Sequence, residues 1–148
     1  AYRSTGDPDT AEDIAMEAFA RIYEARGSFK PMARFTTYLY RVVANLSINV
    51  AKRKRVISCV NLDDHDHAAA GCDPAEIAEQ TELGKAVSEA VLNLPANQRM
   101  ALILTRYEEL SYQDSAEIMG ISVGALESLL HRAKENLRKS LGPFVRLD

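Results

Sequence analysis

The sequence predicts an all-α protein made of two small helical domains joined by an acidic linker. Alanine, leucine, glutamate and arginine are plentiful among its 148 residues, whereas it holds only 7 glycines and 5 prolines, and this composition favours helices. Apolar side chains recur at steps of three and four residues in several segments, which is the pattern of a helix with one buried face. We expect the first domain over residues 1–57, the linker over 58–73 and the second domain over 74–148.

Two long helices are predicted in the first domain. The first begins near Asp9 or Thr10, both of which can cap a helix N-terminus, and ends near Ala25. Its apolar side chains at helical spacing are Ile14, Ala18, Phe19, Ile22 and Tyr23. The second helix begins within residues 34–37 and ends in the basic run Lys52–Arg55. Its inward-facing side chains are predicted to be Phe35, Leu39, Val42, Val43, Leu46 and Val50.

Two shorter helices open the second domain and are separated by Pro95. The apolar stripe of the first is Leu83, Val87, Val91 and Leu94, and that of the second is Met100, Ile103, Leu104 and Tyr107. The linker that precedes these helices shows no sustained periodicity of apolar residues. It carries aspartates, histidines and a glycine.

From Leu110 to Leu137 the sequence predicts a helix–turn–helix. Gly120 supplies the positive φ that a helix C-terminus usually needs, and Ser122 can cap a second helix that starts at Val123. The buried stripe of that helix is Leu126, Leu130, Ala133, Leu137 and Leu141. Such a motif sets the start of its second helix against base edges in the DNA major groove, although a helical hairpin within a bundle gives a similar pattern.

Charge is unevenly distributed along the chain, although the net charge is only −3. Residues 35–56 contain five basic residues and no acid, and residues 57–82 contain seven acids and no Lys or Arg. The balance turns basic again after His131. Two basic regions separated by an acidic one predict contact with an extended polyanion at two places.

Several other classes of protein are disfavoured. No run approaches the roughly 18 apolar residues that cross a bilayer, and neither a signal peptide nor a disulfide scaffold is indicated, so we expect a cytoplasmic protein without membrane insertion. No catalytic triad and no glycine-rich phosphate loop is present, so we expect neither an enzyme nor a cofactor. Cys59, His65, His67 and Cys72 are zinc-ligand types, but their spacing fits no common pairing, and no metal site is expected.

The motifs together resemble a known family. The segment DTAEDIAMEAFARIYEAR, followed by FKPMARFTTYLYRVVANLSIN, is similar to region 2 of bacterial sigma-70 factors. The segment AVSEAVLNLPANQRMALILTRYEELSYQDSAEIMGISVGALESLLHRAKENLRKSL is similar to region 4. With a short linker and no region 3, the chain resembles the extracytoplasmic-function (ECF) subgroup. Further sequence is then expected before Ala1, because family members carry another region 2 helix there.

The resemblance implies a transcription initiation factor that binds core RNA polymerase and promoter DNA, restrained by an anti-sigma factor. Asp13 and Glu17 match the family's polymerase-docking positions. Met16 stands where the family commonly has Gln. Two alternatives stay open: a sigma-like decoy that titrates an anti-sigma factor, and a stand-alone helix–turn–helix regulator. The basic run Lys52–Arg55 argues against the decoy, which has no reason to retain it.

The resemblance also implies two DNA-binding surfaces. The positions that match the −10 surface are Lys30, Arg34, Tyr38, Arg41, Asn45, Asn49, Lys52 and Arg53. The positions that match the −35 surface are Ser122, Val123, Gly124, Ala125, Glu127, Ser128, His131, Arg132 and Lys134. Tyr38 replaces the family's frequent Trp but keeps a ring on which a base can stack.

Region 4 departs from the commonest pattern at two positions, which carry Glu127 in place of Lys and Leu129 in place of Arg. Glu127 can accept a hydrogen bond from cytosine N4, pair with His131, or face solvent. Leu129 widens the buried stripe or packs on a thymine methyl group.

Overall fold

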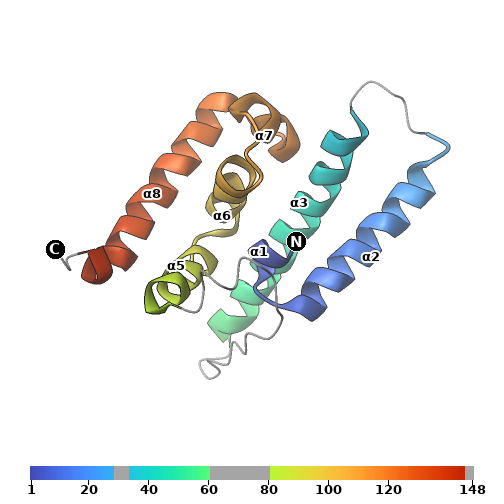
Figure 1. The fold of residues 1–148 in the computed structure, drawn as a ribbon. Helices are drawn as coiled ribbons and strands as arrows, with labels where there is room; N and C mark the ends of the chain where they lie inside the picture. The colour runs from blue at the N-terminus through green and yellow to red at the C-terminus, as the bar shows by residue number, and fades with distance from the viewer. Residues whose placement is uncertain (29–33, 61–80, 146–148) are drawn as a thin grey trace.

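The computed structural model describes residues 1–28, 34–60 and 81–145, and the secondary structure of these residues is helical throughout, without strands (Figure 1). The all-α prediction is therefore confirmed. The linker residues 61–80, and Lys30 among the predicted DNA contacts, lie outside the described residues. No helix within the described ranges is both long enough and apolar enough to cross a membrane.

The first half consists of α1 (Tyr2–Thr5), α2 (Pro8–Ala25) and α3 (Phe35–Val60). The long helices α2 and α3 run side by side in opposite directions (Figure 1). Ile14 and Ala18 on α2 are buried against Leu46 on α3. The side chain of Asp7 caps α2 by accepting a hydrogen bond from the Thr10 amide, 3.1 Å away, so the helix starts slightly earlier than predicted.

The second half consists of α5 (Glu82–Leu92), α6 (Ala96–Leu102), the π-helical turn η1 (Ile103–Tyr107), α7 (Tyr112–Met119) and α8 (Val123–Val145). The long α8 packs against α5, α6 and α7. Leu126 and Ala101 are fully buried in the core of this half, beside Ala116. Pro95 separates α5 from α6 as the sequence predicted.

The two halves also pack against each other, which the sequence did not predict. Helix α3 lies against α6 and α7, and α1 contacts α6. Ala44 of α3 is buried in a cluster with Met100, Leu104 and Ile118 from the second half. Arg99 adds a polar link, because its guanidinium donates to the carbonyl oxygens of Ser4 in α1 and of Leu92 and Leu94 at the end of α5.

Three details of the sequence prediction were wrong. Helix α3 continues beyond the basic run Lys52–Arg55 to Val60, because no residue with a strong preference for a helix end follows that run. Phe35, which was predicted to face inward, is instead more than half exposed, as are three members of the predicted apolar stripes: Phe19, Tyr23 and Leu83. Periodicity identifies an apolar stripe, but the width of the stripe that a neighbouring helix covers depends on tertiary packing. Tyr107 is also 43% exposed, with the guanidinium of Arg3 4.7 Å from its ring centre.

Candidate nucleic-acid interface

The turn of the predicted helix–turn–helix is built by three local features. The Ser111 hydroxyl accepts a hydrogen bond from the Asp114 amide at 3.0 Å and thereby caps α7. Gly120 ends α7 with φ of 66°, the left-handed conformation expected from the sequence. The Ser122 hydroxyl then accepts from the Ala125 amide at 3.1 Å. Together they fix where α8 begins relative to α7.

The N-terminal part of α8 has one buried face and one exposed face. Leu126 and Ala133 are fully buried, so they hold the helix against α6 and α7. Each of the nine residues predicted to contact the −35 element is exposed: Ser122, Val123, Gly124, Ala125, Glu127, Ser128, His131, Arg132 and Lys134. An exposed helix start with a basic flank has the geometry by which a recognition helix enters a major groove.

Glu127 and Leu129, the two positions on α8 that depart from the commonest family pattern, differ in their exposure to solvent. Glu127 is exposed, and His131 faces a different carboxylate, with its Nε2 3.6 Å from Oε1 of Glu135. The pairing of Glu127 with His131 is therefore not observed. Leu129 is half-buried and packs against the core of the second half, so it widens the buried stripe of α8.

A second exposed polar surface runs along α3. Asn45, Asn49, Lys52 and Arg53 are exposed, and the two asparagines lie one helical turn apart on the same face. Arg34 is exposed just before the helix, whereas Tyr38 is half-buried. Amide and cationic side chains at this spacing can hydrogen-bond to base edges and phosphates, so this surface is suited to a nucleic acid strand.

Comparison with known families assigns both halves. A model described as "Sigma-70 region 2" matches residues 1–56, and one described as "Sigma-70, region 4" matches residues 84–137. The ECF RNA polymerase sigma factor SigW of Bacillus subtilis is 34% identical over 149 aligned residues, which cover 95% of this chain and 80% of that protein. The chain belongs to the ECF sigma factors of the sigma-70 family. It is a transcription initiation factor that directs RNA polymerase to promoters.

Other relatives agree with this assignment. The RNA polymerase sigma-H factor of Pseudomonas aeruginosa is 36% identical, with 97% of this chain and 79% of that protein covered. Among solved structures, the sigma factor RpoE of Bartonella quintana in complex with the anti-sigma factor NepR has a TM-score of 0.69 at 24% identity, with 95% of this chain and 86% of that chain covered. CnrH in complex with the cytosolic domain of CnrY has a TM-score of 0.65 at 22% identity, covering 95% and 77% of the two chains. These two structures share the fold.

On α2 of this sigma factor, the predicted polymerase-docking residues lie on the solvent side. Asp13 and Glu17 are exposed, and Glu17 accepts a hydrogen bond from Arg21 at 2.7 Å. Beside them, Met16, Phe19 and Tyr23 are each about two-thirds exposed. Large apolar side chains left uncovered at helical spacing mark a partner surface. The sequence placed Phe19 and Tyr23 only in an apolar stripe, and the spacing of a stripe does not reveal whether another helix or a partner covers it.

Arg41, one of the predicted DNA contacts, is engaged with the second half of the sigma factor. Its guanidinium donates to the backbone oxygen of Glu117 on α7 at 2.9 Å, and the Glu117 carboxylate lies 3.9 Å away. The neighbouring Tyr40 hydroxyl donates to Glu108 at 2.8 Å, and this hydrogen bond raises the pKa of Tyr40. Both links join segments that are far apart in the sequence.

The cysteines and histidines considered as zinc ligands all lie at or beyond the end of α3. His65, His67 and Cys72 lie outside the described residues, as does the side chain of Cys59. Within the residues that are described, no three His, Cys, Asp or Glu side chains gather closely enough to hold a metal ion.

Proposed function

We propose that this sigma factor divides promoter recognition between its two exposed DNA-facing surfaces. The surface on α3 holds the −10 element through Arg34, Tyr38, Arg41, Asn45, Asn49, Lys52 and Arg53, with Lys30 in the preceding loop. The surface on α8 reads the −35 element through Ser122, Val123, Gly124, Ala125, Glu127, Ser128, His131, Arg132 and Lys134. The observation that carries the proposal is the exposure of all nine α8 residues above a buried Leu126.

The α2 surface is proposed to dock on core RNA polymerase. Asp13 and Glu17 supply charge that selects a basic partner, and Met16, Phe19 and Tyr23 supply the apolar area that gives affinity. These five residues are exposed on α2, whereas Ile14 and Ala18 are buried and pack on α3. Docking there leaves the polar surface of α3 available to DNA.

The proposal extends to organisation and regulation. Residues 1–57 form the region 2 domain, residues 58–73 the linker, and residues 74–148 the region 4 domain. An anti-sigma factor is the proposed regulator, since RpoE, a solved structure of the same fold, was captured with the anti-sigma factor NepR. The chain acts in the cytoplasm with the polymerase and has no catalytic activity of its own.

Run-off transcription with purified core polymerase on a promoter library tests the proposal. Replacing Asn49 and Lys52 with Ala should leave capture of core polymerase unchanged but reduce strand opening, measured as permanganate reactivity at the −10 region. Lys85→Ala on α5 is the matched control for loss of an exposed lysine. Undiminished reactivity in the double variant would reject the assignment of the α3 surface.

Polymerase docking is tested separately. Asp13→Lys combined with Glu17→Lys should abolish co-purification with core polymerase because the charge of the docking surface is reversed. Glu89→Lys on α5 changes an exposed acid outside this surface and should have no effect. Equal co-purification of the docking variant and the control would disprove this role of α2.

A further inference from the structure

A wide cleft opens between the C-terminal part of α3, the turn from α1 to α2 and the turn from α5 to α6. Its volume is about 870 Å³, within the range of roughly 300–1,000 Å³ that is typical of small-molecule sites. Residues of all three segments line it, among them Gly6, Asp7, Val50, Ile57 and Pro95. These segments meet near the green, C-terminal end of α3 in Figure 1. The cleft is therefore large enough for one small molecule.

Positive charge gathers in this cleft without matching acids. The cations that line it are Lys52, Lys54 and Arg55 on α3 and Arg99 on α6. Among the described residues that line it, Asp7 is the one acid. Its carboxylate is already engaged, because it accepts a hydrogen bond from the Thr10 amide at 3.1 Å and lies 3.9 Å from Lys54. Within the described ranges, the other three cations have no carboxylate at ion-pair distance, and a cleft lined by one sign of charge attracts ligands of the opposite sign.

Arg99 is the clearest uncompensated charge in the cleft. Among the described residues, its guanidinium donates to neutral carbonyl oxygens, those of Ser4, Leu92 and Leu94. Its Nε atom is buried and has no hydrogen-bond partner in the same part of the chain. Burial and the nearby charge of Arg55 lower the pKa of this group, so its surroundings oppose a positive charge. An anion bound in the cleft would offset that repulsion.

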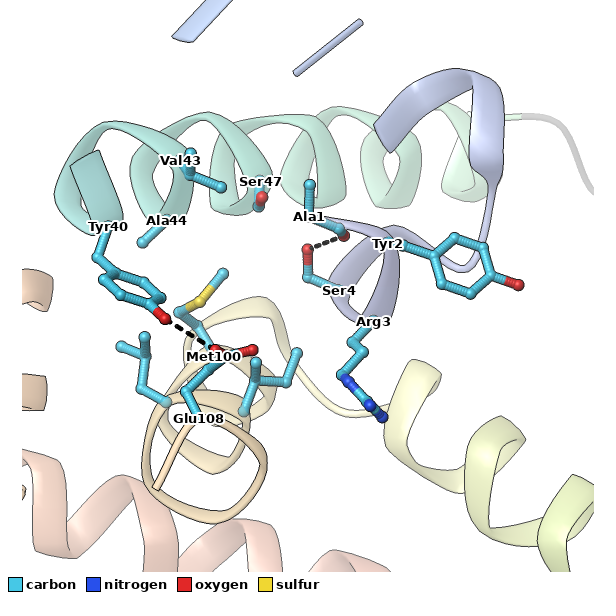
Figure 2. Close-up of a pocket in the computed structure, with 12 residues that line it drawn as sticks. Ala1, Tyr2, Arg3, Ser4, Tyr40, Val43, Ala44, Ser47, Met100 and Glu108 are labelled. Carbon is cyan, nitrogen blue, oxygen red and sulfur yellow. Dashed lines mark hydrogen bonds between the residues drawn. The ribbon is translucent and has the colours of Figure 1, made fainter. Parts of the chain in front are cut away.

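A smaller cavity that shares Ser4 with the cleft lacks this excess of positive charge. It measures about 230 Å³ and is the pocket shown in Figure 2. Glu108 lines it, and the Glu108 carboxylate accepts a hydrogen bond from the Tyr40 hydroxyl at 2.8 Å. Arg3 lines it as well, but the Arg3 guanidinium lies over the ring of Tyr107, 4.7 Å from the ring centre. An anion is therefore favoured in the larger cleft rather than in this cavity.

The cleft also offers apolar and amide groups beside the cations. Ile57 is 59% exposed, and Leu92 and Pro95 line the same space from the second half. Asn93 and Asn97 are exposed and line it too, and a side-chain amide can both donate and accept hydrogen bonds. A ligand that matches these groups carries several negative charges together with a partly apolar group that has hydrogen-bonding edges. A nucleotide with more than one phosphate has both features.

We propose that this cleft binds a nucleoside polyphosphate. Lys52 and Arg55 hold phosphate oxygens, as a guanidinium does with two parallel hydrogen bonds, and the charge of Arg99 attracts them. Ile57 packs against the base, and the Asn97 amide bonds to its edge. The inference goes beyond the proposed function, because this binding needs neither DNA nor polymerase. Lys52 also belongs to the proposed −10 surface, so the variants that test the cleft leave it unchanged.

Isothermal titration calorimetry of the full chain tests the phosphate contacts. ATP and GTP are each titrated without divalent metal, and inorganic tripolyphosphate is the probe that lacks a nucleoside. At least one nucleotide should bind, and more tightly than tripolyphosphate. Arg55→Glu should weaken both kinds of binding by at least about 10-fold, because it replaces a charged hydrogen-bond donor with a repelling carboxylate. Arg106→Glu makes the same charge change at an exposed arginine outside the cleft and should alter the affinities by less than about 2-fold.

A second pair of variants tests the contact with the base. Asn97→Ala should weaken nucleotide binding by roughly 3- to 10-fold and leave tripolyphosphate binding unchanged, because it removes one hydrogen bond to the base. Gln113→Ala removes an exposed amide from α7 and should change neither affinity. Backbone ¹⁵N–¹H resonances locate the site in the unaltered chain. Nucleotide should shift the amides of Gly6 and Asn97, which line the cleft, but not that of Gly124 on α8.

Several outcomes would overturn the proposal. No binding of either nucleotide at about 1 mM would do so, as would an equal loss of affinity in Arg55→Glu and Arg106→Glu. Tripolyphosphate that binds as tightly as both nucleotides would reject the nucleoside. A single-stranded oligonucleotide that shifts Gly6 and Asn97 where nucleotides do not would assign the cleft to nucleic acid instead.

The test is separate from that of the proposed function. Failure of run-off transcription, with nucleotide binding intact, would reject the proposed function and leave the nucleotide site in place. Circular dichroism of each variant confirms that the helices remain folded. Loss of nucleotide affinity in Arg55→Glu and Asn97→Ala, with both control variants unaffected, supports the inference.

Discussion

At the scale of single residues, the helix–turn–helix depends most on Leu126. This side chain is fully buried between α6, α7 and α8, so Leu126→Ala should lower the free energy of unfolding by about 2–5 kcal/mol. Val123→Ala, in the same helix but 40% exposed, should change it by less than about 0.5 kcal/mol. Urea unfolding measures both variants. Equal destabilisation by the two would contradict the packing described for α8.

Gly120 and Gly124 offer a matched test of backbone conformation. A Cβ at either position would meet no other part of the protein within 4 Å beyond the adjacent backbone, but Gly120 has a φ of 66° whereas Gly124 is helical. Gly120→Ala should therefore destabilise the protein by about 1–2 kcal/mol, and Gly124→Ala should stabilise it by up to about 1 kcal/mol. Thermal unfolding of the two variants gives the sign of each change. A stabilising Gly120→Ala would disprove the left-handed turn.

The conformations of single residues were predicted best where atoms of adjacent residues determine them. Gly120 and Ser122 have the roles expected of them, because a helix end and an N-cap are set by adjacent backbone atoms. Phe19 and Tyr23 were misplaced, because exposure depends on whether another helix covers them. A Phe in an apolar stripe looks the same in the sequence whether it packs internally or awaits a partner.

At the scale of helices, the start of α2 is sensitive to pH. Hydrogen bonds from the Thr10 side chain and backbone lower the pKa of Asp7 below its ordinary value of 3.8. A carboxylate with a lowered pKa stabilises the folded state above the ordinary value, and this contribution is lost as pH falls through the lowered one. Asp7→Ala should therefore destabilise the protein at pH 7 but progressively less below about pH 4. A difference in stability that is constant from pH 7 to pH 3 would exclude this cap.

Helix α7 depends on a cap in the same way. Removing the Ser111 hydroxyl leaves the Asp114 amide without its partner at 3.0 Å, so Ser111→Ala should cost about 1 kcal/mol. Ser140→Ala, near the exposed C-terminal part of α8, is the control. Urea unfolding measures the stability of the two variants. Equal free energies of unfolding would argue against the cap.

Helix existence was predicted more reliably than helix length. The sequence indicated each of the long helices, since their apolar stripes extend over several turns. The end of α3 was misjudged because Lys52–Arg55 was treated as a terminal cluster on electrostatic grounds. Lysine and arginine are good helix formers, and α3 runs through them to Val60.

At the scale of the whole molecule, Arg99 ties the two halves together. It donates to three carbonyl oxygens in α1 and at the end of α5, and burial together with the charge of Arg55 lowers the pKa of its guanidinium. Arg99→Lys should destabilise the protein by about 3 kcal/mol, because an ammonium lacks the planar fork that reaches several acceptors. Thermal unfolding measures the loss, with Arg106→Lys as an exposed control.

The arrangement of the two halves was not predictable from the sequence. The sequence around Tyr40, Arg41 and Ala44 gave no signal for partners that lie more than about fifty positions further along the chain. Residue pairs such as Ala44 with Ile118 follow from shape complementarity, which a single sequence does not reveal. The DNA-contact residues stay a prediction from the sequence, and the engagement of Arg41 with α7 only emerges in three dimensions.

The apolar contact between the two halves has a thermal consequence. Burying Ala44, Met100, Leu104 and Ile118 gives the association of the halves a negative heat capacity change, and apolar association of this kind weakens on cooling. The two halves should therefore hold each other less tightly in the cold. Sensitivity to low temperature would thus be inherent in the contact itself.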